Sequence, residues 1–150
     1  NKKNLDFAVD TFGCVAVHDD DILKTECDIL APCALGGVID GNMVKHLRCP
    51  IVCGAANNIL DDPEEDAVAL KIAGIVYGTD FVVNAGGLIH LAGMHLGMST
   101  SELQAKNDEI FNTTLQLLEL GGSASSTYAA AVEIAKQRIA EGQETEVHAG

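Results

Sequence analysis

The stretch IVCGAANNIL, residues 51–60, joins an apolar run to two adjacent amides. Ile51 and Val52 are β-branched, as strand residues commonly are. Asn57 and Asn58 follow where the chain must turn, and asparagine is a common turn former because it tolerates the left-handed region. One interpretation is a strand that ends in turn residues. The other is that a buried strand delivers two amides to the mouth of a cleft, where they hydrogen-bond a small polar ligand.

Two further apolar runs have the same character. CDILAPCALGG, residues 27–37, and GIVYGTDFVVNAGG, residues 74–87, are interrupted by Pro, Gly or Asn and predict strands that are apolar on both faces, as buried parallel strands are. Another strand is expected at Val15 and Val17. Residues 42–48 and 61–74 can form the crossovers between strands, so the alternation predicts an α/β fold with a doubly wound parallel sheet of the Rossmann type.

The remaining segments predict helices. Residues 4–12 carry apolar side chains at helical spacing before Gly13, and the chain after residue 86 is helical in character. In residues 99–122, Ser99 and Glu102 form a possible capping box. The apolar face expected on that helix consists of Leu103, Ile110, Phe111, Leu115 and Leu118. A last helix is expected to end near residue 142, so residues 1–142 form one domain and residues 143–150 a disordered polar tail.

Composition excludes some classes of protein. The 150-residue chain has a formal net charge of −13, which would repel a nucleic acid, and no apolar stretch approaches the roughly 20 residues needed to cross a membrane. We therefore expect a soluble, cytoplasmic protein. Five cysteines in mostly apolar runs predict buried free thiols in a reducing compartment. The spacing of Cys and His residues predicts no metal site.

Four motifs in series resemble a known family. CDILAPCALGGVI, IVCGAANNIL, GIVYGTDFVVNAGGLIHLAG and STYAAAVEIAKQRIAEG are similar, in that order and at similar spacing, to the C-terminal part of the leucine, phenylalanine and valine dehydrogenases of the Glu/Leu/Phe/Val dehydrogenase family. The resemblance implies a partial NAD-binding domain followed by C-terminal helices. The family's glycine fingerprint and catalytic lysine are absent, so the chain is interpreted as a fragment that is inactive alone, with no catalytic residue of its own.

The resemblance also implies roles for individual residues. The backbone around Cys33, Ala34 and Leu35 would pass beside the NAD cofactor. Ala56 and Asn57 would lie at its nicotinamide side, with Asn57 as a ligand of the nicotinamide ribose or amide. Structural alternatives stay open: the residues favour Cys33 as a small buried filler over a reactive thiol, because nothing basic adjoins it, and the Asn pair can be a simple turn. No role is carried over to Asp80, which follows Thr79 where the family commonly has Pro.

The substrate would be an apolar L-amino acid. Asn58 would contact it, and Leu88 and Leu91, three residues apart on a helix, match the family positions that line the pocket for its side chain. The alternative for both leucines is core packing. The resemblance implies reversible oxidative deamination of a branched-chain or aromatic amino acid to its 2-oxo acid and ammonia, by a homo-oligomer when complete. The rival hypothesis is a non-catalytic α/β interaction module that retains the dehydrogenase scaffold.

Overall fold

A small parallel sheet lies at the centre of the chain. The computed structural model describes the backbone of residues 1–148 and the side chains of residues 1–141. Ile29 pairs with Ile51, and Ile51 pairs with Val76. The sheet has three parallel strands in chain order, namely β1 (Ile29–Leu30), β2 (Ile51–Val52) and β3 (Val76–Tyr77). The strands expected in residues 27–37, 51–60 and 74–87 are confirmed, although each has only two residues in the ladder.

Helical segments connect the strands, as predicted. The short helix α2 (Gly41–Val44) precedes β2, and α3 (Pro63–Ile72) precedes β3. The Asp62 carboxylate caps α3 by accepting bonds from the backbone N–H groups of Glu64 and Glu65, each over 3.1 Å. Proline at the first helical position and acidic side chains at the positive end of the dipole also favour a helix start here.

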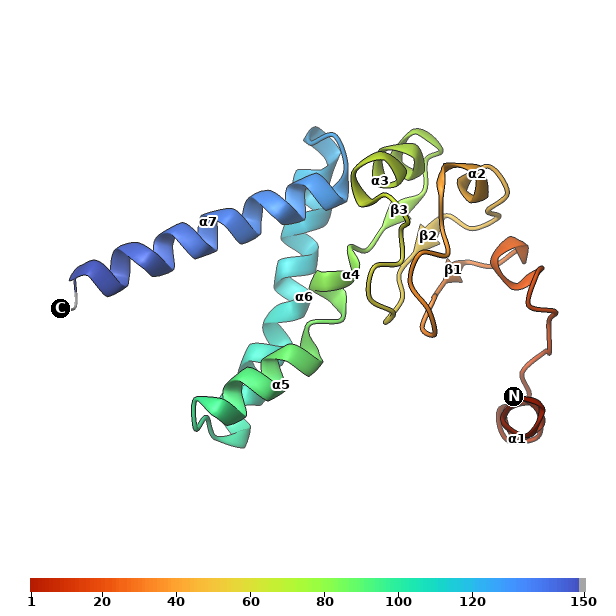
Figure 1. Cartoon of the computed structure of the whole chain (residues 1–150), viewed down its shortest axis with the longest axis horizontal. Coiled ribbons are helices and arrows are strands. Elements are labelled where there is room, and N and C mark those ends of the chain that lie inside the picture. The colour runs from red at the N-terminus through yellow and green to blue at the C-terminus, as the bar shows by residue number, and fades with distance from the viewer. Residues whose placement is uncertain (149–150) are drawn as a thin grey trace.

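Only one face of the sheet is covered. Helices α2 and α3 contact each other and lie on the same side of the strands (Figure 1). Leu30, Val52 and Tyr77 are buried, whereas Ile29 is 56% and Val76 44% exposed. The prediction that the strands are buried on both faces is therefore wrong for the described residues. The strand order also contains no reversal, so the doubly wound arrangement is not confirmed.

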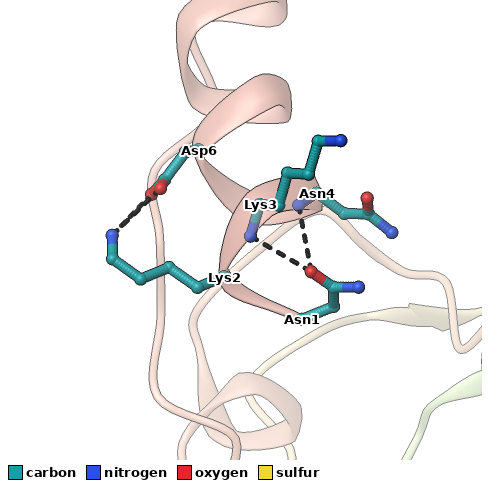
Figure 2. A network of polar contacts seen from close by, with 5 residues as sticks. All are labelled: Asn1, Lys2, Lys3, Asn4 and Asp6. Atoms are coloured by element: carbon teal, nitrogen blue, oxygen red, sulfur yellow. Dashed lines mark hydrogen bonds and ion pairs between the residues drawn. The ribbon is translucent and has the colours of Figure 1, made fainter.

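The first helix stands away from the sheet. Helix α1 (Lys2–Phe12) is capped by the Asn1 side chain, which accepts a 3.1 Å bond from the backbone N–H of Lys3 (Figure 2). Figure 2 also shows the ion pair between the Lys2 ammonium and the Asp6 carboxylate. The two groups lie 3.0 Å apart. The predicted strand at Val15 and Val17 does not form. Val15 is 85% exposed and no strand is paired with this segment, so its backbone lacks the ladder that a strand needs.

Four helices follow β3 and form the helical end of the molecule (Figure 1). They are α4 (Asp80–Val83), α5 (Gly86–His95), α6 (Thr100–Ser123) and α7 (Thr127–His148). The residues predicted as a strand end after Tyr77 thus form the single turn α4. The capping box at the start of α6 is confirmed, since the Ser99 hydroxyl and the Glu102 carboxylate bond each other's backbone N–H groups.

The buried face of α6 is not the predicted one. Thr113, Leu117 and Gly121 are buried, whereas Phe111 is 68% exposed. These buried positions are four residues apart and end on a glycine, where a Cβ atom would lie 2.7 Å from the Thr127 side chain. The helix therefore packs Leu117 against α7, and the glycine at position 121 permits the close approach of the two helices.

Two predictions about the termini and thiols also change. Helix α7 continues to His148, so residues 143–148 of the predicted tail are helical, and residues 149–150 lie outside the described part. The division into domains stays a prediction. All five cysteines are free, but only Cys49 is buried, because Cys14 and Cys33 lie on exposed loops. No helix among the described residues has the length and apolar character to cross a membrane.

Candidate functional site

The carboxyl ends of the three strands meet at one edge of the sheet. Residues 33–36 follow β1, residues 54–58 follow β2, and residues 78–80 follow β3. In parallel α/β sheets, ligands bind in the crevice outside these ends. The three segments and the neighbouring α4–α5 turn contain no Lys, Arg or His. They can therefore bind and orient a ligand by shape and by hydrogen bonds, and the one charged side chain among them is the buried carboxylate of Asp80.

The ends of β1 and β2 approach each other backbone to backbone. The Ala56 amide donates a 3.0 Å bond to the Pro32 carbonyl. A Cβ atom on Gly54 would lie 2.1 Å from that carbonyl oxygen, and one on Gly36 would lie 2.3 Å from the Asn57 carbonyl oxygen. Only glycine fits at both positions, so the absence of side chains there brings the two segments together.

The close contact between the segments after β1 and β2 brings the predicted cofactor-binding residues together. Cys33, Ala34 and Leu35 lie beside the segment that carries Ala56 and Asn57. All of them except Ala56 are exposed, and Leu35 is 72% exposed. The alternative of Cys33 as a buried filler is therefore wrong. The structure brings these five residues to one surface, and their contact with a cofactor stays a prediction.

Asn58 has an uncommon backbone conformation. Its φ angle of 51° is the single positive value found for a non-glycine residue in the described part of the chain. Asparagine tolerates this left-handed conformation better than other residues with a side chain. The Asn58 carbonyl accepts a 2.6 Å bond from the Gly37 amide, while the residue itself is exposed. The turn interpretation is confirmed for its backbone, and its side chain points away from the core.

A third amide side chain, that of Asn84, hydrogen-bonds Asn57. Asn84 was not among the residues predicted from the sequence. The Asn84 amide nitrogen donates a 2.6 Å bond to the Asn57 side-chain oxygen. It also lies 3.4 Å from each of the Ala55 and Ala56 carbonyl oxygens. Asn84 follows α4 and thus ties the helical end to the end of β2. Its position directly before three small residues, Ala85, Gly86 and Gly87, could have indicated it from the sequence, since small residues leave a neighbouring amide accessible.

Asp80 connects the ends of β2 and β3, although no role was carried over to it. Its buried carboxylate accepts a 3.0 Å bond from the Ile59 amide and a 2.7 Å bond from the Phe81 amide. The Ile59 bond fixes the residue next to the left-handed Asn58. Burial, followed by the negative charge of Asp80, raises the pKa of Tyr77 well above its ordinary value, so this phenol stays protonated.

Thr79 differs from its neighbours in having no polar partner. It is 0% exposed, and its hydroxyl makes no hydrogen bond within the described residues. This is the position where the sequence analysis noted a departure from the family's common Pro. A hydroxyl-free proline would leave no such group, so the departure places an unsatisfied polar atom beside Asp80.

Leu88 and Leu91 lie in α5, which begins at Gly86. They are 72% and 68% exposed, and neither belongs to the two buried apolar clusters of the described residues. Core packing, the alternative explanation, is therefore wrong for this chain. Two exposed leucines one helical turn apart form an apolar surface near the amide cluster, and their role in lining a substrate pocket stays a prediction.

The chain is similar to several amino acid dehydrogenases. It is 41% identical over 140 residues to leucine dehydrogenase of Thermoactinomyces intermedius, covering 93% of this chain and 38% of that enzyme. It is 43% identical over 132 residues to valine dehydrogenase of Streptomyces coelicolor, covering 85% of this chain and 35% of that enzyme. The chain thus spans well under half the length of these relatives.

Solved structures show the same fold. The crystal structure of L-tryptophan dehydrogenase from Nostoc punctiforme matches with a TM-score of 0.87 and 31% identity, over 94% of this chain and 43% of that one. A hetero-hexameric glutamate dehydrogenase from Thermus thermophilus, in its Leu-bound form, matches with a TM-score of 0.58 over 89% of this chain and 35% of that one. Because its identity is 20%, the second match supports the fold alone.

A family match covers nearly the whole chain. Residues 3–146 match the family described as Glutamate/Leucine/Phenylalanine/Valine dehydrogenase. The similarities do not confirm a placement in the C-terminal part of the family's members. Together, the extent of the match and the identity to individual members establish that the chain belongs to the Glutamate/Leucine/Phenylalanine/Valine dehydrogenase family.

Proposed function

We propose that the chain forms part of an NAD-dependent dehydrogenase that converts an apolar L-amino acid reversibly to its 2-oxo acid and ammonia. The observation that carries this proposal is the cluster of Asn57, Asn58 and Asn84 amides at the carboxyl ends of parallel strands, in a chain related to leucine and valine dehydrogenases. We further propose that the complete enzyme is an oligomer.

The site residues fit a nicotinamide nucleotide by their chemistry. Small side chains at Cys33, Ala34 and Ala56 allow close approach of a flat ring, and the neutral amides can bond a carboxamide and ribose hydroxyls. When bound, NAD would supply the hydride acceptor for the α-carbon of the substrate. The Asn84 bond to the Asn57 side-chain oxygen orients that amide, so that Asn57 presents its amide N–H groups to the ligand.

The exposed sheet face is also consistent with a larger fold. Ile29 and Val76 are about half exposed, and isolated apolar sheet faces are commonly covered in α/β proteins. We propose that further segments of the complete enzyme cover this face and extend the sheet beyond β1. The arrangement would then be doubly wound.

Substitution of Asn58 tests the proposed function in the complete enzyme. Asn58→Gly removes the amide and keeps the left-handed backbone, whereas an alanine would add backbone strain. We expect kcat/KM for NAD-dependent oxidation of leucine or valine to fall. The loss of transition-state stabilisation should be about 1–3 kcal/mol. Asn4→Ala, on the distant helix α1, is the control and should leave kcat/KM unchanged.

The outcomes distinguish the two roles of Asn58. Full activity of Asn58→Gly would limit this residue to a turn. Failure of the wild-type enzyme to oxidise any apolar amino acid with NAD would contradict the proposed function itself.

Leu88 tests the proposed substrate pocket. Because leucines fill more space than smaller residues, we expect a preference for branched aliphatic substrates over phenylalanine. Leu88→Ala should raise the phenylalanine-to-valine ratio of kcat/KM. The change should correspond to about 1–3 kcal/mol in relative transition-state free energy. Leu96→Ala, at the exposed end of the same helix, is the control. A ratio that stays the same in both variants would remove Leu88 from the pocket.

A further inference from the structure

Two cysteines face each other at the amino ends of β1 and β2, the edge of the sheet opposite to the amide cluster. The strand register pairs Ile29 with Ile51, so two residues earlier Cys27 lies opposite Cys49. The Cys27 amide donates a 3.3 Å bond to the Arg48 carbonyl, which continues this pairing beyond the strands. Neighbouring strands lie about 4.8 Å apart, and disulfides join Cα atoms about 4.4–6.8 Å apart. The backbone separation therefore suits a disulfide.

The two thiols also interact and share one environment. Cys49 is 8% exposed and Cys27 half-buried, and both belong to the apolar cluster beneath the sheet. Burial, and then the neighbouring Cys27 thiol, raises the pKa of Cys49. A buried thiol with a raised pKa attacks slowly, whereas its more exposed neighbour is accessible to small reagents. Within this pair, Cys27 is therefore the thiol that a reagent reaches first.

A second pair of cysteines at the other end of the same strands serves as an internal comparison. By the same register Cys53 lies opposite Ala31, so Cys33 is two residues beyond its partner position. Burial, and then the neighbouring Cys33 thiol, raises the pKa of Cys53, so these two thiols also lie near each other. They are nevertheless displaced by two residues along the strands, whereas Cys27 and Cys49 lie directly opposite each other. Cys33 is exposed, so exposure alone would favour its reaction, whereas the register favours Cys27 and Cys49.

We propose that Cys27 and Cys49 form a redox-active thiol pair that closes to a disulfide by exchange with a low-molecular-weight disulfide such as oxidised glutathione. The Cys27 thiolate attacks one sulfur of the reagent, forms a mixed disulfide and releases one glutathione thiolate. The Cys49 thiolate then attacks the Cys27 sulfur and releases the second glutathione. Two protein thiols are oxidised and one glutathione disulfide is reduced to two thiols, which take up the two protons.

Closure should stabilise the sheet without altering the amide cluster. The new bond would close a loop over residues 27–49, and such a cross-link restricts the unfolded chain. We expect the thermal midpoint to rise by roughly 5–10 °C for a domain of this size. Because the pair lies at the amino ends of the strands, the carboxyl-end segments keep their positions.

Peptide mapping after incubation with oxidised glutathione tests the proposal. We expect a cross-linked peptide that joins Cys27 to Cys49, with a mass two hydrogens below the sum of the two reduced peptides. The thermal midpoint should rise at the same time. In Cys49→Ala, glutathione should remain attached to Cys27, because the second attack is lost. Cys33→Ser is the matched control and should leave the cross-link and the midpoint shift unchanged.

Several results would overturn the proposal. One is a protein whose Cys27 and Cys49 stay reduced while glutathione accumulates on the exposed Cys14 and Cys33. A cross-link between Cys33 and Cys53 would also contradict it, as would a complete lack of reaction at Cys27. Mapping of the wild-type protein alone distinguishes these results, even if Cys49→Ala folds poorly.

Discussion

The sheet and the helical end of the molecule differ in how far they bury their apolar side chains. Beneath the sheet, Ile39, Val52, Ile59 and Leu70 are all 0% exposed. In the helical end, the second buried cluster has four members, namely Leu117, Ala130, Ala131 and Ile134. Large apolar side chains such as Phe111 remain 68% exposed there. The covered face of the sheet is thus packed within this chain, while the helices present apolar surfaces that the chain does not cover.

The helical end also carries an open pocket on its surface. A space of about 360 Å³ lies between α4–α5, α6 and α7 and is lined mainly by apolar side chains, including Ile89 and Ile134. The Arg138 guanidinium donates a 3.1 Å bond to the Thr113 hydroxyl along its wall. Because large apolar side chains of the helical end remain exposed, substitutions of those side chains should cost less than substitutions in the core beneath the sheet.

Truncation of Leu70 should have the largest effect. Leu70→Ala removes a fully buried side chain of α3 and should lower the free energy of unfolding by about 2–5 kcal/mol. Ile72→Ala, on the same helix but 83% exposed, is the matched control and should change it by about 0.5 kcal/mol or less. Urea unfolding measures both.

The counterpart in the helical end is Phe111→Ala. Because Phe111 is 68% exposed, we also expect a change of about 0.5 kcal/mol or less in the isolated chain. A cost as large as that of Leu70→Ala would show that this helix face is covered and would break the comparison between the two regions.

The link between the two regions should have an intermediate effect. Lys71, at the end of α3, donates a 2.9 Å bond to the Gly121 carbonyl and also bonds the carbonyls of Gly122 and Ala124, where α6 ends. A cation at a helix carboxyl end is favourable. Lys71→Met should lower the free energy of unfolding by about 1 kcal/mol.

Two controls sharpen this prediction. Lys71→Arg keeps the charge and should recover part of the loss, whereas Lys45→Met removes an exposed charge elsewhere. If Lys71→Met and Lys45→Met cost the same, the bonds to α6 would contribute nothing, and the two regions would be joined by packing alone.

The smallest effect concerns the start of α6 and depends on pH. Hydrogen bonds from the Ser99 side chain and backbone lower the pKa of Glu102 below its ordinary value of 4.5. Because the folded pKa is the lower one, the stability from this carboxylate is fully present above pH 4.5 and is lost as the pH falls through the folded pKa. The stability difference between wild type and Glu102→Gln should therefore shrink in acid.

Thermal unfolding from pH 3 to pH 7 measures this difference. Glu109→Gln, at an exposed position further along α6, is the control and should show no comparable pH dependence. A difference that is constant with pH would mean that the charged capping box does not contribute to the stability of the helical end.

Local structure was largely predictable because its causes lie within a few residues. The Ser99–Glu102 box acts over three residues of chain and forms as expected. The Asp62 cap of α3 acts over the same short span. The short apolar runs before Pro, Gly or Asn became strands for the same reason. The amides at the end of β2 were visible as well, since Asn57 and Asn58 directly follow that strand.

Tertiary packing decided which faces are buried and which distant residues meet. Asn84 reaches Asn57 across 27 residues, and Asp80 reaches Ile59 across 21. The periodicity of a sequence shows only that a helix has an apolar side. Which side of α6 is buried depended on how closely α7 can approach at Gly121. The sequence by itself determined the helix caps, the strands and the amides, because these depend on adjacent residues. Strand register and helix packing alone brought Asp80, Asn84 and the Cys27–Cys49 pair into place, because those contacts exist only once distant segments lie together.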